Sequence, residues 1–366
     1  MIVELDRSIT RDVKSLSADE LIALTSLATS RLRGFNFLLG HKPDLIALSQ
    51  FTPLGGPSMA AFKKVFHDQT KWANALKKFG FRVRLVKDAT DICEIIEDDT
   101  TIVVISLSDC LKYRIDDKSS LIAENLTDIS FYIRMVEAYL KNLKFASVNL
   151  SYNAVNGGGS TIKDVVEHHY NNHNGISLCI LDSDRETPWG PCGNTAESVT
   201  SSVPQQPYMK CIVTHSREAE NIIPTKILDF FGEKNRIVKL KANKFRNLSK
   251  VIIDSSRPIM YVDFKKGIKN HLTKTACSKT NEFWNSSFEQ SGLLKNCSSQ
   301  QVCTKLKDCT CILVDGWGTD LLKSSVDYLN KNQFNYSDID DYMLEEWNFI
   351  CQSITPYVIA PSKAAG

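Results

Sequence analysis

The first 116 residues switch between helical and extended patterns of apolar positions. Apolar residues recur at helical spacing between residues 21 and 28, and Ser17 and Glu20 form a capping box ahead of them. A second amphipathic helix is predicted over residues 59–78. Extended segments are predicted at residues 45–49, 81–86 and 101–106. We therefore expect residues 1–116 to form a mixed α/β accessory module.

Strand and helix patterns alternate regularly between residues 117 and 235. The predicted strands are residues 121–123, 145–150, 177–181 and 209–215. Helical patterns follow the first two of them, in residues 131–139 and 162–166. This order is typical of a parallel sheet flanked by helices. The predicted fold class is thus α/β, with its central domain at residues 117–235.

The last third of the chain, residues 236–366, is predicted to be mainly helical, with strands at residues 258–262 and 310–314. Its first part is rich in cations. They are Arg236, Lys239, Lys241, Lys244, Arg246 and Lys250 before the first of these strands, and Lys265, Lys266, Lys269 and Lys274 after it. Clustered cations suit a polyanionic substrate, although a solvated helix face has the same composition.

Acidic residues stand where three of the four central strands end. Glu124 follows the first strand, Asp182 and Asp184 follow the third, and Glu218 or Glu220 follows the fourth. Parallel strands bring these ends to one edge of the sheet, where open α/β sheets bind ligands. Carboxylates held close together repel each other, and a divalent cation between them relieves the repulsion. The alternative for each acid is an ordinary helix cap or first-turn residue.

The composition of the chain bears on its cellular location and on the state of its cysteines. Of 366 residues, 43% are hydrophobic and 23% are charged, and the net charge is +2. We find no apolar run long enough to cross a bilayer and no signal-peptide pattern, so we expect a cytoplasmic protein without a membrane partner. The 11 cysteines are expected to be reduced thiols. Those at 297, 303, 309 and 311 lack the paired spacing of a structural zinc site.

The order of these motifs resembles a Toprim domain over residues 117–235. Glu124-Asn-Leu-Thr-Asp128 follows a strand, a glycine-rich turn follows the second strand, and Asp182-Ser-Asp184 and Glu220-Asn221 come after the third and fourth. The pattern is similar to the Toprim nucleases of bacterial anti-phage defence, both OLD-family nucleases and the effector of PARIS-like modules. One difference is Asn125, where many Toprim domains have glycine.

The resemblance implies a metal-dependent nuclease with Mg²⁺ or Mn²⁺ as cofactor. The expected metal ligands are Glu124, Asp128, Asp182, Asp184 and Glu220. Asp128 could equally cap the helix that follows it. Glu124 is also a candidate general acid or base, and Lys265 a candidate stabiliser of the phosphate in the transition state.

The expected substrate is nucleic acid, either DNA or RNA, with tRNA included. The expected substrate-binding residues are Arg185, Lys241, Lys244, Arg246 and Lys266. The glycine-rich loop at residues 156–160 could present backbone N–H groups to a phosphate, or be a plain tight turn. By the resemblance, further partners would be an ATPase or another defence-system subunit, and a second copy of the chain.

Two other functions remain open from the sequence. One is a catalytically silent adaptor that docks to an ATPase or a reverse transcriptase. The other is a phosphate-handling enzyme that acts on nucleotides instead of polymers.

Overall fold

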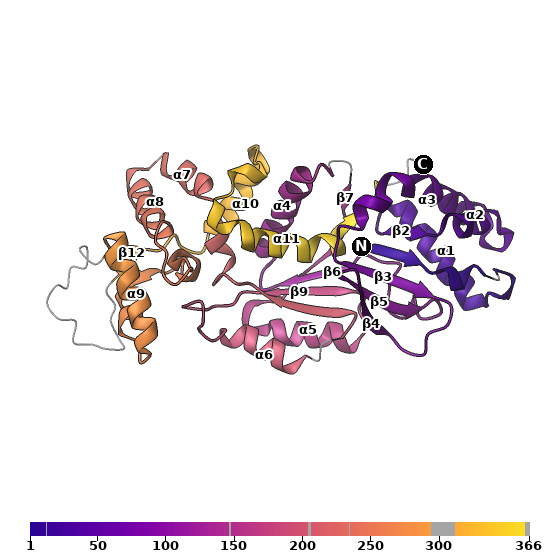
Figure 1. The fold of residues 1–366 in the computed structure, drawn as a ribbon, viewed down its shortest axis with the longest axis horizontal. Coiled ribbons are helices and arrows are strands. Elements are labelled where there is room, and N and C mark those ends of the chain that lie inside the picture. The colour runs from indigo at the N-terminus through magenta and orange to yellow at the C-terminus, as the bar shows by residue number, and fades with distance from the viewer. Residues whose placement is uncertain (12, 146–147, 204–205, 234, 294–311, 363–366) are drawn as a thin grey trace.

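The structure is a computed structural model that describes residues 1–366 apart from 12, 146–147, 204–205, 234, 294–311 and 363–366. The molecule is elongated, with an N-terminal sheet at one end, a central sheet beside it and C-terminal helices at the other end (Figure 1). It is an α/β protein in which mainly parallel sheets are flanked by helices, as predicted.

The N-terminal sheet has five strands in the order β2-β1-β3-β5-β4. Its strands are β1 (Ile2–Leu5), β2 (Phe37–Gly40), β3 (Phe81–Val86), β4 (Cys93–Glu97) and β5 (Thr100–Ser106). All neighbours pair in parallel except β4, which runs antiparallel to β5 at the edge. The helices of this module are α1 (Ala18–Arg33), α2 (Lys42–Gln50) and α3 (Gly55–Leu76). The predicted capping box of α1 is confirmed by reciprocal hydrogen bonds between Ser17 and Glu20.

The prediction of an extended segment at residues 45–49 is wrong, because these residues lie inside α2. Leu45 and Leu48, three residues apart, are both fully buried on one helical face, and a proline in the first turn favours the helix. The strands of this module that the prediction missed are β1, β2 and β4. β1 and β2 have four residues each and β4 has five, too few for an alternating pattern to stand out.

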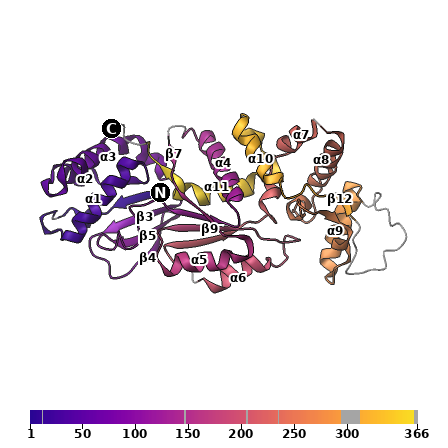
Figure 2. The ribbon, with the colours of Figure 1, turned by 180° about the vertical axis from the view of Figure 1, so that it is seen from behind.

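The central sheet has four parallel strands in the order β10-β9-β6-β8. They are β6 (Ser120–Ala123), β8 (Asn153–Asn156), β9 (Ser177–Leu181) and β10 (Met209–Val213). Helices α4 (Leu126–Asn142) and α11 (Leu344–Val358) cover one face, and α5 (Ile162–Asn171) and α6 (Asn194–Ser202) cover the other, as Figures 1 and 2 show.

The second predicted strand, residues 145–150, is misplaced. The strand that joins the central sheet is β8, several residues later, and it pairs with β6. Among the described residues of the predicted range, β7 (Asn149–Leu150) is the extended part, and it pairs with β13 (Ile359–Ala360) near the C-terminus.

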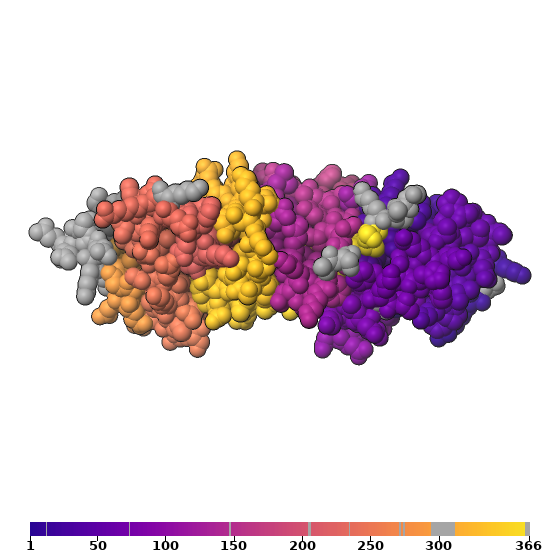
Figure 3. Space-filling view, turned by 90° about the horizontal axis from the view of Figure 1, so that it is seen from above, coloured from indigo at the N-terminus to yellow at the C-terminus, as the bar shows by residue number. Residues whose placement is uncertain are grey.

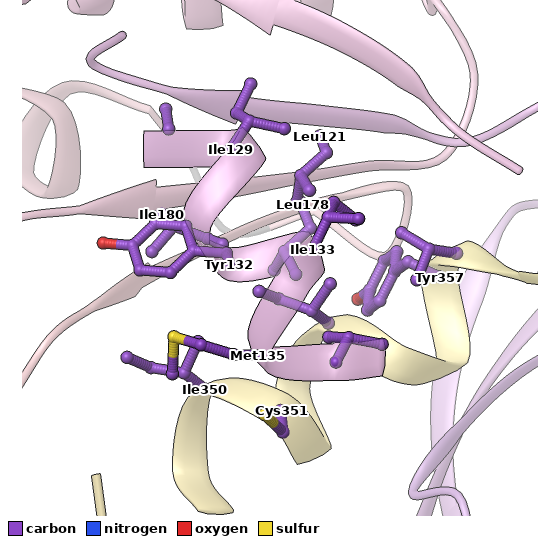
Figure 4. Packing of buried hydrophobic residues seen from close by; sticks show 14 of the residues in the cluster. Leu121, Ile129, Tyr132, Ile133, Met135, Leu178, Ile180, Ile350, Cys351 and Tyr357 are labelled. Atoms are coloured by element: carbon purple, nitrogen blue, oxygen red, sulfur yellow. The ribbon is translucent and has the colours of Figure 1, made fainter. Parts of the chain in front are cut away.

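The core on the α4 face is built from residues far apart in the sequence. Figure 4 shows Leu121 and Ile180 of the sheet packed with Tyr132 and Met135 of α4 and with Ile350 of α11. All five are at most 1% exposed, and burying each such side chain contributes about 1.5–3 kcal/mol. This burial holds the C-terminal helix against the central sheet.

The C-terminal third extends beyond the central sheet. Its helices are α7 (Thr225–Glu233), α8 (Arg236–Ser249), α9 (Ser278–Ser291) and α10 (Leu321–Lys331). Strands β11 (Gly267–Lys269) and β12 (Ile312–Asp315) form an antiparallel pair. Figure 3 shows the last part of the chain, in yellow and including α10, between the orange region of α7, α8 and α9 and the central domain.

Two sequence predictions in this third differ in outcome. The described part of the second predicted strand is β12, whose Leu313 and Val314 are buried as expected. The strand predicted at residues 258–262 is wrong, because Pro258–Tyr261 form a 3₁₀ helix. The four cysteines between 297 and 311 lie outside the described residues. Among the described helices, none combines the length and apolarity needed to span a membrane.

Candidate functional site

Six carboxylates gather at the carboxyl edge of the central sheet. Glu124 follows β6 directly and Asp182 follows β9 directly, while Glu218 and Glu220 follow β10 after a short loop. We call the group the acidic cluster. It consists of Glu124, Asp128, Asp182, Asp184, Glu218 and Glu220. The charges of Asp184, Asp128 and Glu218 act on Glu124, and those of Asp128, Glu124 and Glu220 act on Asp182.

Burial and mutual repulsion raise the pKa values of Glu124, Asp128, Asp182, Glu218 and Glu220. Burial, followed by the charges of Asp184 and Asp128, raises the pKa of Glu124 to about 7. Burial and the charge of Glu220 raise the pKa of Glu218 to about 7. Asp182, only 9% exposed, has its pKa raised well above the usual range, mainly by burial. The cluster therefore holds more negative charge than its surroundings stabilise, and a cation would lower its free energy.

Lys265 supplies one positive charge to this group. Its Nζ lies 3.4 Å from Oε2 of Glu218 and 3.2 Å from Oε1 of Glu220. Burial alone would lower the pKa of Lys265, but the charges of Glu220, Glu218 and Asp182 raise it above its usual range. The ammonium group therefore stays charged at neutral pH.

The segment that carries Lys265 is attached to the turn after β10. The side-chain amide of Asn221 donates to the carbonyl oxygens of Ile259 and Val262, at 2.8 and 2.9 Å. The backbone N–H of Phe264 donates to Oε1 of Glu218 at 2.9 Å. These bonds explain why residues 258–262 do not form a strand, since their carbonyls are used to hold the turn that bears Glu218.

Buried hydrogen bonds of Ser183 hold the loop Asp182-Ser183-Asp184 in place. Ser183 is fully buried; its N–H donates to Oγ1 of Thr214 at 3.1 Å, and its hydroxyl donates to the Ser216 carbonyl at 2.7 Å. The Asp184 backbone is left-handed, with φ of 53°, an uncommon conformation for a non-glycine residue. Asp182 points into the cluster, whereas Asp184 is exposed.

The glycine-rich loop positions the strand end that carries Glu124. The N–H of Gly157 donates to the Ala123 carbonyl at 2.8 Å, and that of Gly159 donates to the Glu124 carbonyl at 3.2 Å. A Cβ on Gly157 would lie 2.6 Å from the side chain of Ile162, so only glycine fits there. Two of the loop amides are thus used within the protein, which favours the tight turn over the phosphate site, the two alternatives that the sequence left open.

Asp128 takes part in capping α4, but it is not the N-cap that the sequence left open, because α4 begins at Leu126 and its N-cap is Asn125. The Asp128 carboxylate accepts from the backbone N–H of Asn125 at 2.9 Å in a capping box at the start of α4. It is also 8% exposed and within electrostatic reach of Asp182. Asn125 itself is extended, with φ of −136° and ψ of 156°, so this position requires no glycine.

Two buried oxygens of the acidic cluster bear on whether it can hold a cation. Within the described part of the chain, no three His, Cys, Asp or Glu side chains are arranged to hold a metal ion. However, Oε1 of Glu124 and Oε2 of Glu220 are buried without a hydrogen-bond partner. Buried carboxylate oxygens without donors are costly, and oxygen is the ligand that Mg²⁺ prefers. The donor set therefore fits the chemistry of a hard divalent cation.

The predicted substrate-binding cations fall into two groups. Arg185, half-buried beside Asp184, has a buried Nε without a hydrogen-bond partner, and Lys266, next to Lys265, is 72% exposed. The other three are used within the C-terminal third. Lys241 donates to the Gly316 carbonyl, Lys244 donates to the Leu313 carbonyl, and Arg246 pairs with Asp229. Arg185 and Lys266 therefore adjoin Asp184 and Lys265 in sequence, with Lys266 paired to Asp263, whereas Lys241, Lys244 and Arg246 make contacts that stabilise α8.

Some residues of the site were not found from the sequence. Tyr132, fully buried on α4, has its hydroxyl 3.5 Å from Oδ1 of Asp182. Glu346 of α11 accepts hydrogen bonds from the backbone N–H groups of His215 and Ser216, at 2.7 and 3.2 Å. Neither has a motif that marks it, because both reach the site through tertiary packing. Glu218 had been an alternative to Glu220, and both belong to the cluster.

Comparison with known proteins gave no match: no protein-family model, no curated protein and no solved structure is significantly similar to this chain.

Proposed function

We propose that this protein is a metal-dependent nuclease, with the acidic cluster as its catalytic centre. The observation that carries the proposal is the convergence of buried carboxylates from three strand ends, two of them with unpaired oxygens, around one lysine. Hydrolysis of a phosphodiester requires charge neutralisation at the phosphate and an activated water. Clustered carboxylates with raised pKa values in a partly buried site are suited to both needs.

Glu124, Asp182, Asp184 and Glu220 would hold the cation. When bound, Mg²⁺ or Mn²⁺ would supply Lewis acidity and a more acidic water. Since the pKa of Glu124 is about 7, its carboxyl group can exchange a proton near neutral pH. Lys265 remains protonated and can stabilise negative charge that develops on a phosphate oxygen.

The finer assignment rests on the resemblance of the sequence to Toprim nucleases of anti-phage defence. It is supported by the order of Glu124, Asp182-Ser-Asp184 and Glu220 on successive strand ends. The proposed substrate is DNA or RNA, with tRNA included, because cations beside the cluster recognise the backbone and not the bases. A partner ATPase, another defence-system subunit and a second copy of the chain belong to the same proposal.

A specific observation favours a second candidate, the catalytically silent adaptor. Lys265 already pairs with Glu218 and Glu220, and the described residues include no ready-made group of three metal ligands. In an adaptor, this lysine would serve as a permanent structural counter-charge, and no cation would enter.

The test is incubation of the purified protein with mixed DNA and RNA, with Mg²⁺, with Mn²⁺ or with chelator. A nuclease should cleave at least one nucleic acid in the presence of a cation and none with chelator. An adaptor should cleave neither while still binding its partner protein. Turnover of mononucleotides without cleavage of polymers would instead support the nucleotide-directed alternative.

A further inference from the structure

A small pocket opens beside the acidic cluster. It has a volume of about 220 Å³, and its walls include Glu186, Arg217, Asp263, Lys266, Gly267 and Lys269. Most of these walls adjoin the cluster in sequence. Glu186 is two residues after Asp184, and Arg217 directly precedes Glu218. Asp263 lies two residues before Lys265, and Lys266 directly follows it. The pocket is therefore built on the same loops as the proposed catalytic centre.

Arg217 is the main polar group of this pocket. Its side chain is only 15% exposed, and its two terminal nitrogens lie 3.5 Å from Oε1 of Glu186 and 3.8 Å from Oδ2 of Asp263. Charge-assisted hydrogen bonds are shorter, at about 2.7–2.9 Å. The guanidinium group is therefore oriented by two carboxylates without being tightly bound by either.

The backbone fixes Arg217 firmly although its side chain is loosely paired. Its N–H donates to the Met260 carbonyl at 2.8 Å, and its carbonyl accepts from the N–H of Asp184 at 2.8 Å. Arg217 thus connects the loop of Asp184 to the segment before Lys265. A guanidinium group on a fixed backbone can donate two parallel hydrogen bonds to one phosphate.

Other residues of the pocket wall add positive charge, and a glycine leaves part of the wall without a side chain. Lys266 and Lys269 bring two further cations, so three positive groups face the two carboxylates of Glu186 and Asp263. Gly267 has φ of 90°, and a Cβ there would lie 2.2 Å from the Val314 carbonyl. This wall therefore has to be bare backbone, and the pocket carries a net positive charge beside a negative cluster.

We propose that this pocket binds a backbone phosphate of a nucleic-acid substrate, with Arg217 as its two-point ligand. The phosphate would be a neighbour of the one cleaved at the acidic cluster, and this placement rests on the proposed function. Glu186 and Asp263 orient the guanidinium in the free protein, and the incoming phosphate replaces their long contacts with shorter ones.

The test measures binding separately from cleavage. Short labelled oligonucleotides of single-stranded and double-stranded DNA and RNA are titrated in chelator, with salt varied, and adenosine monophosphate is used as a competitor. The variants are Arg217→Gln, Arg217→Lys and Lys269→Gln. The control is Lys163→Gln, which removes a partly exposed cation of α5 outside the pocket. Thermal unfolding verifies that each variant is folded.

We expect Arg217→Gln to weaken oligonucleotide binding about tenfold, and to reduce the dependence of log Kd on log salt by about one. Arg217→Lys should keep the salt dependence but lose affinity, because it retains charge without the planar fork. Lys269→Gln should weaken binding less. If Arg217→Gln does not fold, the affinities of Arg217→Lys and Lys269→Gln decide whether the pocket binds the oligonucleotide.

The pocket assignment is overturned if these variants bind like the wild type, or lose no more affinity than Lys163→Gln. It is also overturned if adenosine monophosphate binds in an Arg217-dependent way and no oligonucleotide binds. If oligonucleotide binding depends on Arg217 but the protein cleaves no nucleic acid with Mg²⁺, the result supports the phosphate pocket and contradicts the proposed nuclease activity. If the protein cleaves nucleic acid and replacement of Arg217 changes neither binding nor cleavage, the result supports the nuclease activity and contradicts the phosphate pocket.

Discussion

The hydroxyl of Ser183 donates a 2.7 Å hydrogen bond to the carbonyl of Ser216, and both residues are fully buried. Ser183 separates Asp182 from Asp184, and Ser216 lies two residues before Glu218. One hydrogen bond therefore connects two of the three strand ends that supply the acidic cluster. The geometry of the cluster depends on this contact and on the groups behind it.

Glu346 supports that contact from the C-terminal helix. It is 3% exposed, and its Oε1 accepts from the N–H groups of His215 and Ser216. Glu346→Ala would leave these donors without an acceptor and lower the free energy of unfolding by about 1–3 kcal/mol. Chemical denaturation measures this change. The control is Glu345→Ala, an exposed neighbour; an equal effect of the two variants would contradict a specific role for Glu346.

The ionisation of His215 should report on the same contact. Its Nδ1 lies 2.8 Å from Oε2 of Glu346, and the hydrogen bond to Glu346 raises the pKa of His215. Burial and the charge of Arg185 oppose this rise, while Glu345 adds to it. Because the charged form is favoured in the folded state, the stabilisation is present below pH 6.5 and is lost as pH rises through the folded pKa.

An NMR titration of the His215 ring tests this prediction. The pKa should lie above 6.5 in the wild type and fall toward 6.5 in Glu346→Gln, which cannot attract the imidazolium ion as a carboxylate does. Identical titration curves for the two proteins would show that Glu346 does not control this ionisation.

Gly193 should be essential to the position of Asp184. A Cβ on Gly193 would lie 2.5 Å from Cβ of Asp184, and the Gly193 N–H donates to the Ser183 carbonyl at 2.8 Å. We expect Gly193→Ala to displace Asp184 and to lower the rate of cleavage at least about tenfold. Gly56→Ala is the control, since a Cβ there meets no atom within 4 Å. Equal rates for both variants would refute the prediction.

Lys265 should stabilise the acidic cluster as well as serve the chemistry. Lys265→Met leaves Glu218 and Glu220 buried without their cation, and removing one partner of a buried ion pair is destabilising. Because the lysine side chain is 35% exposed, solvent screening reduces the loss to about 1–2 kcal/mol. Thermal unfolding of Lys265→Met and of Lys323→Met, an exposed lysine of α10, measures the difference. A similar loss in both would argue against this role.

The sequence predicted the parts of the site that depend on topology. Buried strands such as residues 177–181 are recognisable from their apolar run, and parallel pairing brings their ends to one edge. Glu124 and Asp182 could therefore be placed together before the structure was known. The same reasoning failed for residues 258–262, where Pro258–Tyr261 form a 3₁₀ helix and the carbonyls of Ile259 and Val262 accept hydrogen bonds from Asn221 instead of pairing with a strand.

Other features could not be predicted because they depend on long-range contacts. Glu346 reaches the acidic cluster only because α11 packs on the central sheet, more than 120 residues after His215. The contacts of the cations on α8 could not be predicted either. Their density indicated a substrate surface, but Lys241 and Lys244 each have a backbone partner near β12, which a pattern of charges does not reveal.

The central claim is that the acidic cluster cleaves phosphodiester bonds with the help of a divalent cation. Its most direct test compares the wild type with Glu124→Gln and Asp182→Asn, on whichever nucleic acid the wild type cleaves in Mg²⁺. Both replacements keep side-chain shape and remove a charge that burial disfavours, so both variants should fold. We predict that cleavage falls at least about 100-fold in each while the unfolding temperature is maintained. Wild-type rates in both variants would contradict the claim.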